Sequence, residues 1–209
     1  MGVGRGHASD GESLRHAVRV AAVEVFGMVG FHAASMDEIS YRAGVSKPLV
    51  YQHFPGKLAL YSAVLQHYID LLLDGLGGSL DACRLDESRV RDVVSAWFEF
   101  VERQPHARRV IFESDMLNEP GVRAQVMTAV EAIVEALVGA FGPIDDRDRF
   151  RMRIAAAGLV GSWWSAVAEV ADTPGRAAAV DALAALCWRG LASVPIGSVE
   201  LKSSPAAER

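Results

Sequence analysis

The segment "AGVSKPLVYQHFPGK", residues 43–57, decides how this chain is interpreted, because it joins two short stretches with helical patterns. Ser35 precedes "MDEISYRA" with a glutamate three positions later, a pattern typical of a helix start. Gly44 is suited to end that helix. Ser46 can accept a first-turn amide of the next helix, and Pro48 sits early, where its missing amide costs little. The segment therefore predicts a helix-turn-helix, the unit whose second helix enters a DNA major groove.

Helical spacing of apolar residues extends along the rest of the chain. One helix is predicted to end at Gly30, and a longer one starts at Leu58 and fades at "DGLGG". Five further helical stretches are separated by Pro, Gly and Asp, and none alternates as a strand would: residues 87–104, 107–116, 120–141, 146–171 and 174–194. The predicted fold class is all-α, with a three-helix N-terminal helix-turn-helix domain.

Composition limits the class of protein. The 209 residues are 51% hydrophobic and 22% charged, which is typical of a packed globular chain. The longest apolar run, residues 154–168, is shorter than a membrane span, no secretory signal is recognisable, and Cys83 and Cys187 lack a partner motif. We therefore expect a cytoplasmic protein with no membrane partner. The first sixty residues carry six Lys/Arg and five Asp/Glu, against an overall charge of -5.

The second helix of the motif carries side chains that suit DNA. Its first turns present lysine, leucine, tyrosine and glutamine, which can meet base edges, whereas serine, histidine and a second lysine nearby suit phosphates. Val45, Val50 and Phe54 are interpreted as core. A packing role remains open for the tyrosine and the histidine, and simple solvation for the second lysine. The predicted DNA contacts are Ser35, Ser46, Lys47, Pro48, Leu49, Tyr51, Gln52, His53 and Lys57.

Residues 13–65 resemble the DNA-binding domain of the TetR family of bacterial transcriptional regulators. The shared features are Phe26, Gly30, Ser35, "AGVS", Tyr51, His53, Phe54 and Lys57. The resemblance implies a helix-turn-helix domain at 12–57 and a helical effector-binding and dimerisation domain at 58–195. The low-complexity ends, 1–11 and 196–209, are predicted to be flexible. Many members carry glycine in place of Pro48, so a base preference cannot be transferred.

Small residues mark the last two long helices. "AAAGLVGS" and "AAAVDALAALC" allow close helix approach, and in the family the final helix pair forms the interface across a two-fold axis. A homodimer is therefore predicted. The alternative is that these residues only fill an intramolecular bundle.

An apolar effector is predicted to enter between the middle helices. The segments "RRVIFESDMLNEPGVRAQV", "GLVGSWWS" and "ASVPI" are similar to actinobacterial TetR-type regulators of fatty-acid synthesis, and this resemblance implies a long-chain acyl-CoA. Arginines 103, 108 and 109 could attract its phosphates, or form a solvated basic loop. The candidate effector-binding residues, each of which could equally be core, are Trp97, Phe98, Phe112, Met116, Met127, Met152, Trp163 and Trp164.

Enzymatic motifs are not recognisable. No HExxH, CxxC or GxSxG pattern occurs, and neither a cofactor nor a metal is predicted. The predicted function is a ligand-responsive repressor of lipid-related or neighbouring genes. Two alternatives are a ligand-dependent activator of fatty-acid synthesis genes and a helical protein-interaction adaptor without DNA binding.

Overall fold

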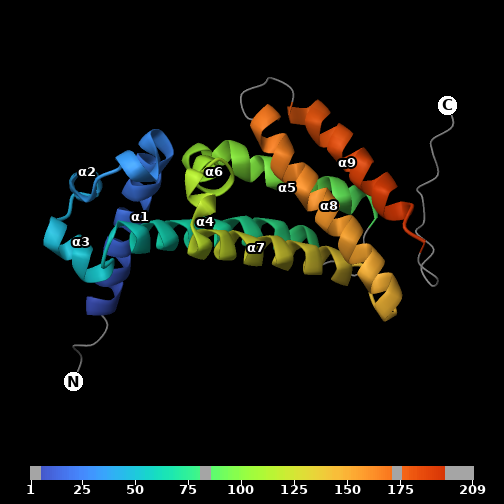
Figure 1. The fold of residues 1–209 in the computed structure, drawn as a ribbon, viewed down its shortest axis with the longest axis horizontal. Coiled ribbons are helices and arrows are strands. Elements are labelled where there is room, and N and C mark those ends of the chain that lie inside the picture. The colour runs from blue at the N-terminus through green and yellow to red at the C-terminus, as the bar shows by residue number, and fades with distance from the viewer. Residues whose placement is uncertain (1–5, 81–85, 171–175, 196–209) are drawn as a thin grey trace. The chain divides into compact units, whose positions relative to one another are not determined.

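The computed structural model describes residues 6–80, 86–170 and 176–195, and within these residues the only regular elements are helices (Figure 1). The predicted all-α class is confirmed. The predicted tail at 196–209, part of the predicted N-terminal segment and Cys83 lie outside the described residues. The elements are α1 (Gly6–Ala33), α2 (Met36–Arg42), α3 (Lys47–His53), α4 (Lys57–Leu80), α5 (Glu87–Arg103), α6 (Pro105–Phe112), the 3₁₀ turn η1 (Asp115–Asn118), α7 (Pro120–Gly139), α8 (Asp146–Val170) and α9 (Arg176–Ala192).

The chain folds as two compact units. The first unit combines the chain up to Asp70 with Gln104–Gln125, so it holds α1, α2, α3, the start of α4, α6, η1 and the start of α7. The second unit combines Leu71–Arg103 with the chain from Val126 onward. The predicted division between residues 57 and 58 falls inside the first unit.

In the first unit, α1 supplies the buried face on which the motif rests. Val18 and Ala22 are completely buried, and Phe26 is nearly so. Gly30 interrupts the helix with φ 76° and ψ 170°, a left-handed conformation that glycine adopts without a side-chain clash. This agrees with the predicted stop, although α1 begins at Gly6, inside the segment expected to be flexible. Helices α2 and α6 both pack against α1.

In the second unit, α9 packs against both α5 and α8 (Figure 1). The buried side of α5 includes Val90, Val94 and Trp97. An exposed ion pair between Arg91 and Asp181 joins α5 to α9. Helix α4 continues to Leu80, beyond its predicted end at "DGLGG". The stretch predicted as one helix over 107–116 is divided between α6 and η1. Among the described residues, no helix combines the length and apolar character needed to cross a bilayer.

Candidate nucleic-acid interface

The α2–turn–α3 segment has helix-turn-helix geometry because each boundary is set by a local backbone requirement. Ser35 is the N-cap of α2, and its Oγ accepts the Glu38 amide at 3.1 Å. Gly44 has φ 68°, and its amide donates to the Tyr41 carbonyl at 3.1 Å, which turns the chain out of α2. Ser46 occupies the N-cap position of α3 but makes no capping hydrogen bond with its side chain, contrary to the prediction.

One side of α3 holds the motif together. Val50 is completely buried and Phe54 is 6% exposed, beside the fully buried Ile39 of α2. These positions agree with the predicted core, whereas Val45 is only half-buried. The opposite side of α3 is consequently left facing solvent.

That exposed side carries most of the predicted base-reading residues. Lys47, Pro48 and Gln52 are exposed, and Tyr51 is 42% exposed, so part of its ring is open to a partner. Leu49 is half-buried. The first turns of α3 therefore present two polar side chains, an aromatic ring and a proline ring to anything that covers this face.

Lys47 is paired with α2. Its Nζ lies 2.8 Å from Oδ1 and 2.9 Å from Oδ2 of Asp37. The hydrogen bond that Lys47 donates to Asp37 raises the pKa of the Lys47 ammonium, and both side chains remain well exposed. Asp37 was not among the residues predicted from the sequence to form this surface.

His53 is held at the end of α3 by the first helix. Arg15 Nε donates to His53 Nδ1 at 3.3 Å, so a neutral His53 carries its proton on Nε2. The ring is half-buried, which leaves room for both the packing role and the phosphate role.

Lys57 has a structural role that the sequence analysis missed. Its Nζ donates to the carbonyls of Ala34 at 2.9 Å and His32 at 3.1 Å, and it lies 4.6 Å from the centroid of the Phe31 ring. These contacts join the start of α4 to the chain that leaves α1. The two carbonyls that accept from Lys57 lie 23 and 25 residues earlier in the chain, so no local sequence pattern indicates this role.

The end of α1 also meets α6 closely. A Cβ on Gly27 would lie 2.8 Å from His106 Cβ, and Arg109 Nη1 donates to the Gly27 carbonyl at 3.1 Å. Tyr61 donates to the Val110 carbonyl at 3.0 Å and lies 2.6 Å from Ser114 Oγ. Burial raises the pKa of the Tyr61 phenol to about 12. Glycine at position 27 is therefore required by the approach of α6.

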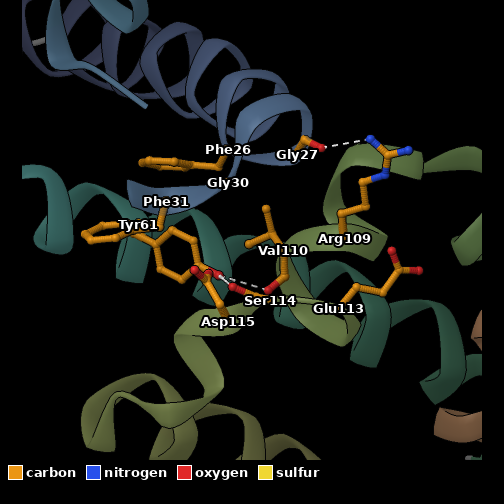
Figure 2. A pocket seen from close by; sticks show the side chains of 10 residues that line it. All are labelled: Phe26, Gly27, Gly30, Phe31, Tyr61, Arg109, Val110, Glu113, Ser114 and Asp115. Atoms are coloured by element: carbon orange, nitrogen blue, oxygen red, sulfur yellow. Dashed lines mark hydrogen bonds between the residues drawn. The ribbon is translucent and has the colours of Figure 1, made fainter. Parts of the chain in front are cut away.

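A cavity of about 250 Å³ opens beside this junction (Figure 2). Aromatic rings from α1 and α4 line one side, and polar residues from α6 and the following turn line the other. None of the eight predicted effector-binding residues lines it. Its walls are formed by Phe26, Gly27, Gly30, Phe31, Tyr61, Arg109, Val110, Glu113, Ser114 and Asp115.

The predicted effector-binding residues are divided between the units. Phe112 and Met116 are buried in the first unit. In the second unit, Trp97 and Trp163 are fully buried with ring centroids 5.7 Å apart, and Trp163 Nε1 donates to Cys187 Sγ at 3.0 Å.

The other second-unit candidates differ in exposure. Phe98 and Met152 are buried, Trp164 is half-buried and Met127 is 49% exposed. An effector site made of all eight residues stays a prediction.

The predicted phosphate-attracting arginines do not form a basic loop. Arg103 pairs with Glu99 at 2.6 Å in the second unit. In the first unit, Arg108 is buried and lies 3.0 Å from Glu113, and Arg109 is engaged with Gly27. Each guanidinium therefore has a partner within the protein.

The small-residue helices show two different faces. Ala156 and Ala184 are buried inside the unit, where they allow α8 and α9 to approach. Ala157, Gly158 and Gly161 are exposed on α8. Large apolar side chains are exposed on the same two helices, with 65% of Phe150, 61% of Ile154 and 56% of Leu186 accessible.

Comparisons with known proteins agree with this geometry. The model of bacterial regulatory proteins of the tetR family matches residues 18–64. The HTH-type transcriptional activator FasR of Mycolicibacterium smegmatis is 38% identical over 198 residues, covering 92% of this chain and 89% of FasR.

Solved structures share the fold. A TetR-like transcriptional regulator from Rhodococcus sp. RHA1 has a TM-score of 0.71 at 26% identity, covering 86% of this chain and 96% of that one. FadR from Bacillus subtilis, in complex with stearoyl-CoA, has a TM-score of 0.65 at 16% identity, covering 84% and 98%. The chain therefore belongs to the TetR family and is a DNA-binding transcriptional regulator.

Proposed function

We propose that two copies of this chain bind a pseudo-palindromic operator, with each α3 in a major groove and the two helices about 34–36 Å, or a multiple of this, apart. The observation that carries the proposal is the division of α3: Val50 is completely buried, whereas Lys47 and Gln52 face solvent. A surface of this kind offers donors and acceptors to base edges without unfolding the motif.

Residues around α3 are proposed to fix its position on the phosphates. The hydroxyl protons of Ser35 and Ser46 are donors suited to phosphate oxygens, and His53 offers Nε2–H. Lys57 would contribute a third N–H beside the two that reach carbonyls. Phosphate contacts of this kind orient a protein on DNA but do not read its sequence.

The dimer is proposed to form through α8 and α9. Exposed Phe150, Ile154 and Leu186 on these helices make an apolar face, and the small residues 157, 158 and 161 on α8 permit close approach of a second helix. A two-fold axis through such a face would present two reading helices to one operator.

An acyl chain, delivered as long-chain acyl-CoA, is the proposed effector. Support comes from the 38% identity to FasR and from the stearoyl-CoA held by the same fold in FadR of Bacillus subtilis. Because no basic loop forms from arginines 103, 108 and 109, recognition would depend on the apolar chain. We therefore expect affinity to rise with chain length by at most about 0.8 kcal/mol for each buried methylene.

The direction of control is proposed to be activation of lipid-related genes. Repression was expected from the sequence, but FasR is named as an activator and covers nearly the whole chain. Whether the regulator activates or represses, a ligand can change its affinity for the operator only if the ligand binds the operator-competent and incompetent arrangements with different affinity.

Selection from randomised duplex DNA tests the proposed function. Wild-type protein should enrich two inverted half-sites, and log Kobs should fall linearly with log salt concentration. Calorimetry with an acyl-CoA chain-length series and transcription with purified polymerase would then test the effector and the direction. Enrichment of no sequence would overturn operator binding, whereas an effector series without chain-length dependence would overturn only the lipid proposal.

A further inference from the structure

The Asp37–Lys47 pair joins an acidic residue in the first turn of α2 to the start of the reading helix. Both carboxylate oxygens lie within 2.9 Å of Lys47 Nζ, and 72% of the Asp37 side chain is exposed. The neighbouring acidic residue, Glu38, is paired differently: its partner is Arg42 on the same helix, at 2.6 Å. Of these two carboxylates, only that of Asp37 is paired with a residue of α3, the helix proposed to enter the groove.

The N-terminus of α2 favours acidic residues in its first turn, but it does so for Glu38 as much as for Asp37 and does not explain the pairing with α3. Exposed ion pairs contribute little to folding, because both ions remain hydrated. A carboxylate on a surface that approaches phosphates also weakens DNA binding by charge repulsion. Asp37 therefore carries a cost for binding any DNA, which a specific contact can offset.

The pair presents a donor beside an acceptor. Lys47 has three N–H donors and no acceptor, so alone it would bind guanine, thymine or phosphate oxygens with little discrimination. The Asp37 carboxylate has about four lone-pair positions, and accepting from one ammonium leaves capacity for a second donor. It also holds the flexible lysine in one direction.

This arrangement matches a G·C pair at more positions than an A·T pair. In the major groove, a G·C pair offers two adjacent acceptors, guanine N7 and O6, followed by the cytosine N4 amino donor. An A·T pair places the adenine N6 donor between two acceptors, so it gives the ammonium one acceptor beside that donor instead of the two adjacent acceptors of guanine. Reversing G·C to C·G would exchange the partners of the lysine and the carboxylate.

We propose that Asp37 determines sequence specificity: with Lys47 it forms a couple that reads one G·C base pair in each half-site, the ammonium contacting guanine and the carboxylate accepting from cytosine N4. This inference rests on the proposed entry of α3 into the major groove. It adds a residue of α2, and a cytosine contact, to the surface that reads DNA.

Randomised-operator selection provides the first test. Lys47→Ala locates the base pair that the lysine reads, and Asp37→Asn should relax preference at that same pair by at least about fivefold. Glu38→Gln is the matched control, because it removes one charge from the same turn while retaining a residue suited to the cap. It should strengthen binding to all sequences and leave the preference unchanged.

Modified bases test the cytosine contact in the wild-type protein, whose fold is not altered. Pyrimidin-2-one in place of that cytosine lacks the N4 amino group and should weaken binding severalfold. The same replacement should have little further effect on Asp37→Ala, because the acceptor is already gone. Inosine in place of the guanine keeps the major-groove edge and serves as the DNA control.

Three results are decisive. Non-additive effects of Asp37→Ala and the N4 deletion support the couple. Equal strengthening of all sequences by Asp37→Asn and Glu38→Gln, or additive effects in the cycle, overturns it while Lys47→Ala still marks a base pair. If the wild-type protein selects no sequence, the proposed operator binding fails, and this inference fails with it.

Discussion

The helix-turn-helix and the second unit use the same kinds of residue in different ways. In α3, polar side chains face solvent above a small buried side, so their exposure separates binding candidates from core. In the second unit, Trp97 and Trp163 pack against each other completely buried, and their chemistry does not separate a ligand wall from a core. Exposed polar residues near a turn are therefore more informative about function than buried aromatic residues.

The largest expected effect is a loss of operator affinity when the exposed apolar face of α8 and α9, the proposed dimer face, is altered. Ala157→Arg would place a charge on the proposed dimer face, and loss of the second half-site should reduce operator affinity by about 10²–10⁴. Sedimentation and titration with a defined operator would measure both changes. Ala132→Arg on the exposed side of α7 is the control and should remain dimeric.

Ala184→Arg would not test the same interface. Ala184 is 3% exposed, so an arginine there disrupts the protomer itself. A wild-type protein that sediments as a monomer while binding its operator tightly would contradict the dimer proposal.

Substitutions in the buried core of the second unit should lower the free energy of unfolding. Trp97→Ala is expected to lower the free energy of unfolding by about 3–5 kcal/mol, because it deletes a fully buried indole that packs on Trp163. Denaturant unfolding measures the loss, with the half-buried Trp164→Ala as a milder comparison. A small loss at Trp97 together with abolished acyl-CoA binding would instead identify it as a ligand wall.

Lys57 has a structural role and a proposed phosphate contact, and substitution can measure the two separately. Lys57→Ala should cost about 2 kcal/mol of unfolding free energy, since two charge-assisted hydrogen bonds to carbonyls are lost. If Lys57 also contacts a phosphate, the salt slope should fall by about 0.9. An unchanged unfolding free energy would contradict the structural role.

Folding stability is expected to depend on pH through Tyr61. Its pKa is raised from 10.0 to about 12 by burial, so the folded state retains a proton that the unfolded chain loses between these values. The stability contributed by the neutral phenol is complete below about pH 10 and is lost as pH rises toward about 12. Unfolding of wild type and Tyr61→Phe from pH 8 upward should show the two curves converge, and parallel curves would contradict it.

Much of the motif could be predicted from sequence because its determinants are local. Gly30 and Gly44 have positive φ, and Ser35 caps a helix within three residues. Ser46 met the backbone requirement of an N-cap without the expected side-chain bond. Local patterns thus specify backbone conformation better than they specify side-chain partners.

Partners distant in sequence could not be predicted. Lys57 bonds to carbonyls more than twenty residues earlier, and Arg109 bonds to Gly27 from another helix. The division of the effector candidates between two units could not be predicted either, because each unit is built from helices that are far apart in the chain. The charge and apolar character of each residue are evident from the sequence, whereas its partners are evident only from the structure.

Base readout by α3 is tested most directly by comparing two glutamines in randomised-operator selection. Gln52→Ala, on the exposed side of α3, should relax preference at one position of each half-site by about 1–3 kcal/mol, while Gln66→Ala on α4 should leave every preference unchanged. Identical preferences for wild type and Gln52→Ala would contradict readout through this face of α3.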